Sequence, residues 1–244
     1  MEVDILAVGV HPDDIELSCS GTLLQHIDQG YTVGLLDLTR GELGSRGSGE
    51  IRTKEALAAA EKIGAKFREN ADMADGFFQY SPENIRKIIR VIRWCRPKIV
   101  LANALSDRHP DHGRAAKLTA DACFYSGLLK IETFDKQGHN QEKWRPEVVY
   151  HYSQDRNGKA DFVVDIAKYF EQKMEVILCY ESQFHPVANS AAYADQPQTP
   201  ISGKDFMDYQ RHKAAAYGRE AGFELAEAFN VNRVIGVKDL FSLT

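Results

Sequence analysis

Two short polar clusters in this chain combine imidazole and carboxylate side chains, and each follows a strand-like apolar segment. The first, residues 11–16, reads His-Pro-Asp-Asp-Ile-Glu after Leu-Ala-Val-Gly-Val. The second, residues 109–112, reads His-Pro-Asp-His and comes soon after Lys-Ile-Val-Leu-Ala-Asn-Ala. Imidazole nitrogens and carboxylate oxygens are ligands of zinc and related divalent ions. The two clusters therefore indicate a metal centre, provided that the fold brings them together.

The first cluster also has a simpler structural interpretation. Asp13 could cap a helix and Glu16, three residues later, could close a capping box, while acidic residues suit the positive end of a helix. This interpretation explains neither His11 nor Asp14. Taken alone, the cluster leaves a helix start and a metal site equally open, and the second cluster favours the metal site.

The elements between the clusters are typical of an α/β protein with one domain spanning residues 1–244. Short β-branched segments alternate with longer segments of helical periodicity. We expect strands at residues 4–10, 31–39, 98–104, 147–152 and 161–165, and helices at 15–29, 51–63, 81–96, 167–180 and 205–218. The pattern predicts a Rossmann-like, doubly wound and mostly parallel sheet with helices on both faces.

That topology predicts where the two clusters meet. In a doubly wound sheet the strand order reverses beside the first strand, and ligands bind outside the carboxyl ends of the strands at this switch point. His11, Asp14 and His112 can then supply two nitrogens and one oxygen to zinc, with a fourth position open to water. Iron(II) or cobalt could occupy the same set of ligands. Zinc lowers the pKa of bound water from ~15.7 to about 7, and Asp13 is placed to take its proton.

Bulk properties exclude several other classes of function. The net charge of −5 gives no nucleic-acid footprint, and no apolar segment approaches the ~18 residues of a membrane span. The N-terminus lacks the features of a signal peptide, and the four cysteines form no Cys-x-x-Cys pair. We therefore expect a cytoplasmic protein that acts on a small molecule.

The two motifs together resemble the LmbE-like, PIG-L family of zinc deacetylases, which remove acetyl groups from N-acetylglucosaminyl compounds. Residues 37–56, DLTRGELGSRGSGEIRTKEA, resemble the bacillithiol-biosynthesis branch of that family, as does YGREAGFELAEAF near the C-terminus. The resemblance implies zinc held by His11, Asp14 and His112. It also implies Asp13 as general base and then acid, and a trimer or hexamer of the chain.

The resemblance implies further roles around the metal. His109 would stand protonated near the developing oxyanion, with Asp111 as its charge partner. Arg52 would bind sugar hydroxyls, and Tyr193 would assist at the oxyanion. We interpret the glycine-rich segment 41–49 as a mobile rim with Arg40, Arg46 and Arg52 available for ligand oxygens, and the polar segment 185–203 as a lid or binding loop.

The sequence thus predicts a zinc-dependent N-deacetylase acting on N-acetylglucosaminyl malate. Alternatives within the enzyme class are a deacetylase of N-acetylglucosamine or chitooligosaccharides and a thiol-conjugate amidase. A non-catalytic sugar-binding protein is a third hypothesis. It leaves Asp13 unexplained, because binding needs no proton shuttle.

Overall fold

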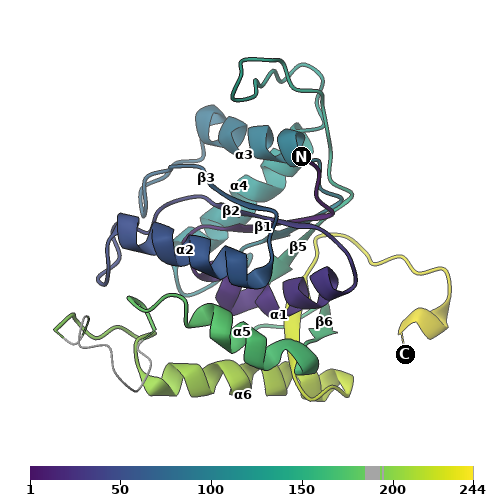
Figure 1. The fold of residues 1–244 in the computed structure, drawn as a ribbon. Coiled ribbons are helices and arrows are strands. Elements are labelled where there is room, and N and C mark those ends of the chain that lie inside the picture. The colour runs from purple at the N-terminus through teal and green to yellow at the C-terminus, as the bar shows by residue number, and fades with distance from the viewer. Residues whose placement is uncertain (185–192, 194, 244) are drawn as a thin grey trace.

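The computed structural model describes residues 1–184, 193 and 195–243, and these residues form a mixed, mostly parallel sheet (Figure 1). Its strands follow the spatial order β3-β2-β1-β4-β5-β7-β6. Strands β1 to β5 are parallel, whereas β7 runs antiparallel to both β5 and β6. The strands are β1 (Ile5–Gly9), β2 (Val33–Asp37), β3 (Phe67–Asn70), β4 (Ile99–Ala102), β5 (Val148–Tyr152), β6 (Phe162–Asp165) and β7 (Ala226–Asn230). The predicted α/β fold is confirmed.

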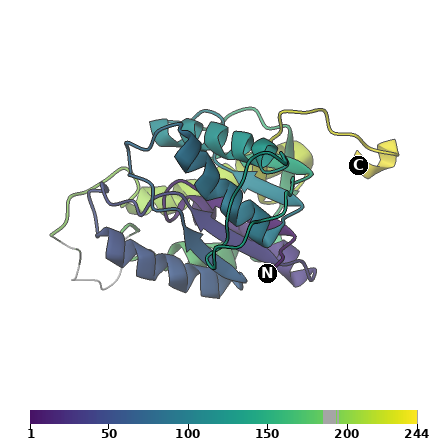
Figure 2. The ribbon, with the colours of Figure 1, turned by 90° about the horizontal axis from the view of Figure 1, so that it is seen from above.

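Helices cover both faces of the sheet. Figure 1 shows α3 and α4 on one face and α1, α2, α5 and α6 on the other. Seen from above, the segment after β7 extends away from the body of the molecule (Figure 2). The helical segments are α1 (Asp14–Asp28), α2 (Gly49–Ile63), α3 (Pro82–Cys95), α4 (Pro110–Tyr125), η1 (Ala167–Tyr169), α5 (Phe170–Ile177), α6 (Lys204–Ala221) and η3 (Leu240–Leu243). No helix in the described part of the chain is long and apolar enough to span a membrane.

Alternate residues of β1 supply two separate apolar cores. Ile5 and Ala7 pack in the core that lies against α1 and α2, and Leu6 and Val8 pack in the core that lies against α3 and α4. A parallel strand buried on both faces reads as a continuous apolar run, as this one does. The end of β1 is therefore fixed from both sides, and so is the loop that follows it.

Two strands, β3 and β7, were not predicted from the sequence. β3 has the sequence Phe-Arg-Glu-Asn, which lacks the apolar alternation of a half-buried strand, and it lies at the edge of the sheet. Arg68 within it makes buried ion pairs with Asp37 and Glu16, so distant charges hold this strand in place. The other is β7, which lies beyond the last predicted helix at residues 205–218 and pairs with both β5 and β6.

The predicted reversal of strand order is present. β1 lies between β2 and β4, so the loops after β1 and β4 meet at the switch point of the sheet. These loops carry the two polar clusters.

Candidate metal centre and active-site cavity

Asp14, the first residue of α1, has a carboxylate held by four hydrogen bonds. Its Oδ2 accepts from the backbone N–H groups of Val10 and His11, each at 2.9 Å, and from Nδ2 of Asn103 at 2.9 Å. Its Oδ1 accepts from Nε2 of Gln154 at 3.0 Å. The side chain is buried, and its orientation is fixed by the loop after β1 and by the segments that follow β4 and β5.

His11 and His112 both face this carboxylate. Nε2 of His112 lies 3.3 Å from Oδ1 of Asp14, and Nδ1 of His11 lies 3.8 Å from Oδ2. Burial opposes protonation of both rings, but the surrounding carboxylates raise the pKa of His11 to about 10 and that of His112 to about 9. The field at this point therefore favours positive charge. The structure brings the three predicted ligands together, and their nitrogen and oxygen donors suit a borderline divalent ion.

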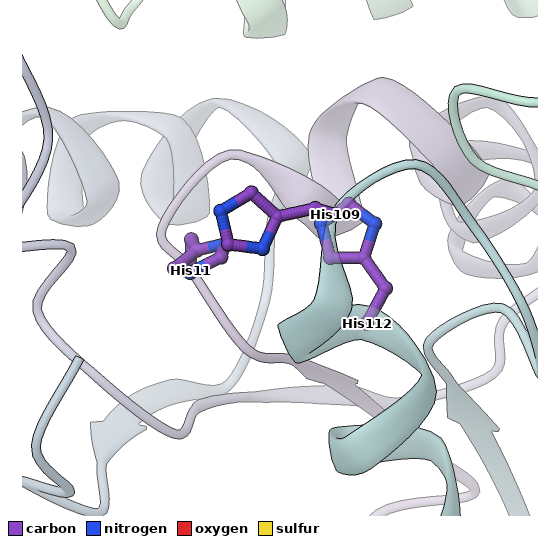
Figure 3. A group of neighbouring side chains, drawn as sticks. All are labelled: His11, His109 and His112. Carbon is purple, nitrogen blue, oxygen red and sulfur yellow. The ribbon is translucent and has the colours of Figure 1, made fainter. Parts of the chain in front are cut away.

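A third imidazole, that of His109, completes a group of histidines (Figure 3). Its ring stacks on His112 at 5.2 Å between centroids and meets the edge of His11 at 4.8 Å. Each of these three histidines offers one nitrogen as a potential metal ligand, and the three nitrogens lie within 4.8 Å of one another. A second such group consists of His11, Asp75 and Asp111.

Asp111 contacts His109 through the backbone and not through its carboxylate. Nδ1 of His109 accepts from the N–H of Asp111 at 3.2 Å. The carboxylate of Asp111 instead lies 3.4 Å from Nε2 of His11, accepts from the N–H of Gly76 at 3.0 Å and pairs with Arg114. Burial, together with the positive field of His11 and His112, lowers the pKa of His109. The structure thus favours a neutral His109, whereas the resemblance implies a protonated one.

Two aspartates contact the far nitrogens of the candidate ligands. Nδ1 of His112 lies 2.5 Å from Oδ2 of Asp107, and Nε2 of His11 lies 3.1 Å from Oδ1 of Asp75. A histidine that binds a metal through one nitrogen usually donates its other N–H to a carboxylate or carbonyl, which fixes the tautomer. This arrangement is therefore the one expected around a metal.

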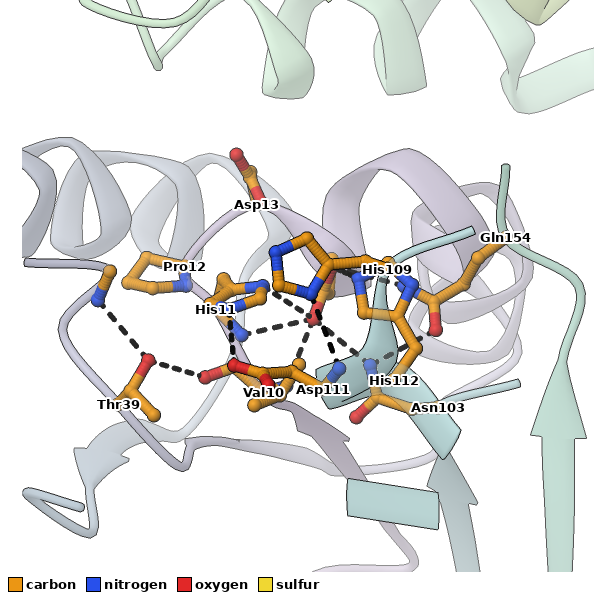
Figure 4. Close-up of polar contacts among 12 residues, drawn as sticks. Val10, His11, Pro12, Asp13, Thr39, Asn103, His109, Asp111, His112 and Gln154 are labelled. Carbon is orange, nitrogen blue, oxygen red and sulfur yellow. Dashed lines mark hydrogen bonds and ion pairs between the residues drawn. The ribbon is translucent and has the colours of Figure 1, made fainter. Parts of the chain in front are cut away.

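Asp13 lies beside this cluster but makes different contacts. Its backbone has φ 114°, in the left-handed region, and its side chain does not cap α1. Its Oδ2 accepts from Nη2 of Arg52 at 2.9 Å, and its carboxylate points away from Asp111 (Figure 4). Burial raises the pKa of Asp13 to about 7 although Arg52 opposes the shift. The capping-box interpretation is wrong, because Glu16 pairs with Arg68.

Arg52 is held by backbone carbonyls as well as by Asp13. It donates to the carbonyls of Gly41, at 3.3 Å, and Pro12, while its Nε has no partner among the described residues. Gly41 has φ +64°, and a Cβ atom there would collide with Nη1 of Arg52. Glycine at this position therefore lets the guanidinium reach the loop that carries Asp13.

The expectation that Arg46 is available on a mobile rim is wrong. Its side chain is buried, and it donates to the carbonyls of Ser182 at 2.8 Å and Pro197 at 3.0 Å. It also donates to the carbonyl of Tyr193 at 3.4 Å. Arg40 is exposed and pairs with Asp72 at 2.7 Å.

The candidate ligands open into a cavity of about 510 Å³. Leu43 and Gly44 are among its lining residues, as are Lys213 and the exposed Phe77. Residues 199–201 of the predicted lid line it too, whereas residues 185–192 and 194 lie outside the described residues. Tyr193 is not among the residues that line the cavity, so this structure does not bring it to the site.

Four polar residues of the site were missed by sequence reasoning. Asp107 lies in the same segment as the second motif, and Asn103 directly follows β4, so both carried a local signal. Asp75 and Gln154 contact the site from distant segments whose sequences give no such signal.

Comparison with known proteins identifies the family. The family model for PIG-L, described as GlcNAc-PI de-N-acetylase, matches residues 6–123. Diacetylchitobiose deacetylase of Thermococcus kodakarensis is 30% identical over 191 residues, which cover 74% of this chain and 70% of that protein. The chain belongs to the PIG-L deacetylase family. It is therefore an enzyme, a hydrolase that cleaves an amide bond.

Other similar proteins include one that is named for a different reaction. 4-Oxalmesaconate hydratase of Pseudomonas putida is 27% identical over 205 residues, covering 74% of each chain. The conserved protein TT1542 of Thermus thermophilus is 32% identical, with a TM-score of 0.82 over 97% of this chain and 98% of that one. N,N′-diacetylchitobiose deacetylase of Pyrococcus horikoshii shares the fold, with a TM-score of 0.77 at 23% identity over 97% of this chain and 88% of that one.

Proposed function

We propose that this member of the PIG-L family is a zinc-dependent hydrolase that removes the acetyl group from an N-acetylglucosaminide. The observation that carries the proposal is the position of Asp13. This carboxylate is buried at the edge of the cavity, does not cap its helix, and adjoins Asp14 and His11. A binding protein would have no use for such a group, whereas hydrolysis of an amide needs a proton acceptor that later becomes a donor.

His11, Asp14 and His112 are the residues that would hold the zinc ion. Bound there, zinc supplies a Lewis acid that polarises the acetyl carbonyl and lowers the pKa of water. Asn103 and Gln154 keep the Asp14 carboxylate in place through their amide hydrogens.

Asp13 moves the proton. A carboxyl group with a pKa of about 7 can take a proton from the attacking water and return it to the departing amine near neutral pH. Arg52, at 2.9 Å, holds the carboxylate in one orientation. Arg52 also lines the cavity, and the family resemblance implies that it binds sugar hydroxyls.

His109 stabilises the developing oxyanion as a hydrogen-bond donor. The N–H of Asp111 occupies Nδ1 of His109, so a neutral ring carries its proton on Nε2. A donor held in place before the reaction stabilises charge as it appears in the transition state. On this basis Asp111 positions the His109 ring through its backbone.

For the group attached to the sugar we propose malate, as in bacillithiol biosynthesis in the cytoplasm. Support comes from the resemblance of residues 37–56 to that branch of the family and from Arg108, an exposed basic side chain of the cavity lining. Diacetylchitobiose is the second candidate, because the deacetylase that is 30% identical carries that substrate in its name.

The test is acetate release by zinc-loaded protein from N-acetylglucosaminyl malate, diacetylchitobiose and N-acetylglucosamine. We expect the highest kcat/KM on the malate conjugate and a loss of turnover in Asp13→Ala. Equal and negligible acetate release by both proteins would support a binding protein. Hydration of 4-oxalmesaconate without acetate release from any of the three would contradict the proposal.

A further inference from the structure

Asp75 links a candidate metal ligand to the wall of the cavity. Its carboxylate is buried, and its Oδ1 lies 3.1 Å from Nε2 of His11. Its Oδ2 accepts from the backbone N–H of Leu43 at 3.0 Å. One carboxylate therefore serves two donors, one on the loop after β1 and the other on the turn at residues 41–44, which we call the rim turn.

The segment that carries Asp75 is itself held in place. The N–H of Asp75 donates to Oε1 of Glu42 at 2.9 Å, and the N–H of Gly76 donates to Oδ2 of Asp111 at 3.0 Å. The rim turn is closed by a hydrogen bond of 3.0 Å from the N–H of Gly44 to the carbonyl of Gly41. A shift of the Asp75 side chain would therefore disturb both the turn and His11.

Asp75 is the better acceptor for His11, although Asp111 is also near. Oδ2 of Asp111 lies 3.4 Å from Nε2 of His11, and the carboxylate already pairs with Arg114 and accepts from Gly76. Asp75 offers the shorter contact and, in the described residues, has no basic partner other than His11. Donation from Nε2 leaves the lone pair of His11 on Nδ1, the atom that faces Asp14 at 3.8 Å.

We propose that Asp75 is a positioning residue that couples metal binding at His11 to the conformation of the rim turn. Leu43 and Gly44 line the cavity, so the residue that orients the ligand also places part of the wall that the substrate meets. The inference rests on the metal centre of the proposed function and goes beyond it. It assigns a role to a residue that neither sequence motif contains.

The experiment measures zinc binding and rim-turn protection without any substrate. Zinc affinity is determined by competition with a chromogenic chelator for the wild type, Asp75→Asn and the matched control Glu42→Gln. The Asp75→Asn substitution keeps the shape of the side chain but leaves an acceptor at only one of its two polar atoms. The Glu42→Gln substitution keeps an acceptor for the N–H of Asp75 and leaves the contact between Asp75 and His11 intact.

We expect zinc affinity to fall by about 10- to 100-fold in Asp75→Asn, the usual range for loss of such a partner, and by less than about threefold in Glu42→Gln. Hydrogen exchange of residues 41–48 is then measured with and without zinc. Zinc should slow this exchange in the wild type and in Glu42→Gln, but not in Asp75→Asn. Equal zinc affinity in Asp75→Asn and the wild type, or equal protection by zinc, would overturn the proposal.

The two readouts separate this inference from the substrate assignment. If no acetate is released from any amino sugar, the zinc affinities and exchange rates still decide the role of Asp75. If the wild type binds no zinc, the inference fails together with the proposed metal centre. Should Asp75→Asn not fold, Asp75→Ser, which retains one acceptor, is expected to show the same loss of zinc affinity and of protection.

Discussion

Replacing Arg68 by methionine should destabilise the protein severely, because this arginine is the shared ion-pair partner of two buried carboxylates. Its Nε and Nη2 each lie 2.7 Å from an oxygen of Asp37, and its Nη1 lies 2.5 Å from Oε1 of Glu16. The exposed fraction of each of the three side chains is at most 3%.

The magnitude follows from what the substitution leaves behind. Removing one partner of a buried ion pair typically costs about 3–5 kcal/mol, because the other charge stays buried and unpaired. Arg68→Met leaves two such carboxylates close together, so we expect a loss of about 5 kcal/mol at pH 7.5. A domain has only about 5–15 kcal/mol of stability in total, so the loss is a large part of it.

The assay is urea unfolding of the wild type, Arg68→Met and the control Lys62→Met. Lys62 pairs with Glu175 at 2.9 Å, but both side chains are substantially exposed, and such pairs contribute about 0–1 kcal/mol. With a slope of about 2–3 kcal/mol per molar urea, the Arg68→Met midpoint should fall by roughly 2 M. Adding Glu16→Gln and Asp37→Asn should recover most of the loss.

Acid should also recover part of the loss in Arg68→Met. Burial already raises the pKa of Asp37, and removing the guanidinium that opposes this shift raises it further. A carboxyl whose folded-state pKa lies above its unfolded value binds more protons when folded, so stability rises as pH falls. A loss of stability in Arg68→Met no larger than in Lys62→Met, or a loss larger at pH 5.5 than at pH 7.5, would rule out this role of Arg68.

Three further outcomes can be checked. Asp13→Asn should lower kcat for acetate release by about 10²- to 10⁴-fold. Its zinc affinity, measured by chelator competition, should stay within a few-fold of the wild-type value. A comparable loss of zinc affinity would count against a proton-transfer role for Asp13. Burial lowers the pKa of Lys213 to about 7 in the folded protein. Between about pH 7 and 10 the unfolded chain therefore binds one more proton at this side chain than the folded protein does. The free energy of unfolding should rise across this pH range by up to ~5 kcal/mol. The charged groups that act on Lys213 are Lys173, Asp107, Asp155 and Glu227. Urea unfolding at pH 7 and pH 9.5 should show this rise in the wild type and not in Lys213→Met. We expect a trimer or hexamer, in which the exposed Val234 and Leu240 could be buried. Light scattering should then give a molar mass of three or six times 27.4 kDa.

The parts of the site that the sequence predicted are those encoded locally. His11, Asp14 and His112 lie in two compact motifs, and the rules of parallel sheets bring the ends of their strands together. The apolar run at residues 4–10 likewise predicted strand β1. Both inferences use neighbours in sequence and one topological rule.

The parts that failed depend on partners far along the chain. Arg46 lies in a glycine-rich segment typical of a surface loop, yet its acceptors are the carbonyls of Ser182 and Pro197, 136 and 151 residues away. The sequence of β3 is polar and gives no strand pattern, because its Arg68 is held by ion pairs with Asp37 and Glu16. Asp75 lies 64 residues from His11, and no periodicity links the two.

Zinc-edge anomalous diffraction from crystals of the metal-loaded protein would locate the ion among the side chains of the cavity. We expect one strong peak within coordination distance of His11, Asp14 and His112, with Asp13 beside it but not bound. A peak on other residues, or no peak at stoichiometric zinc, would contradict the proposed metal centre.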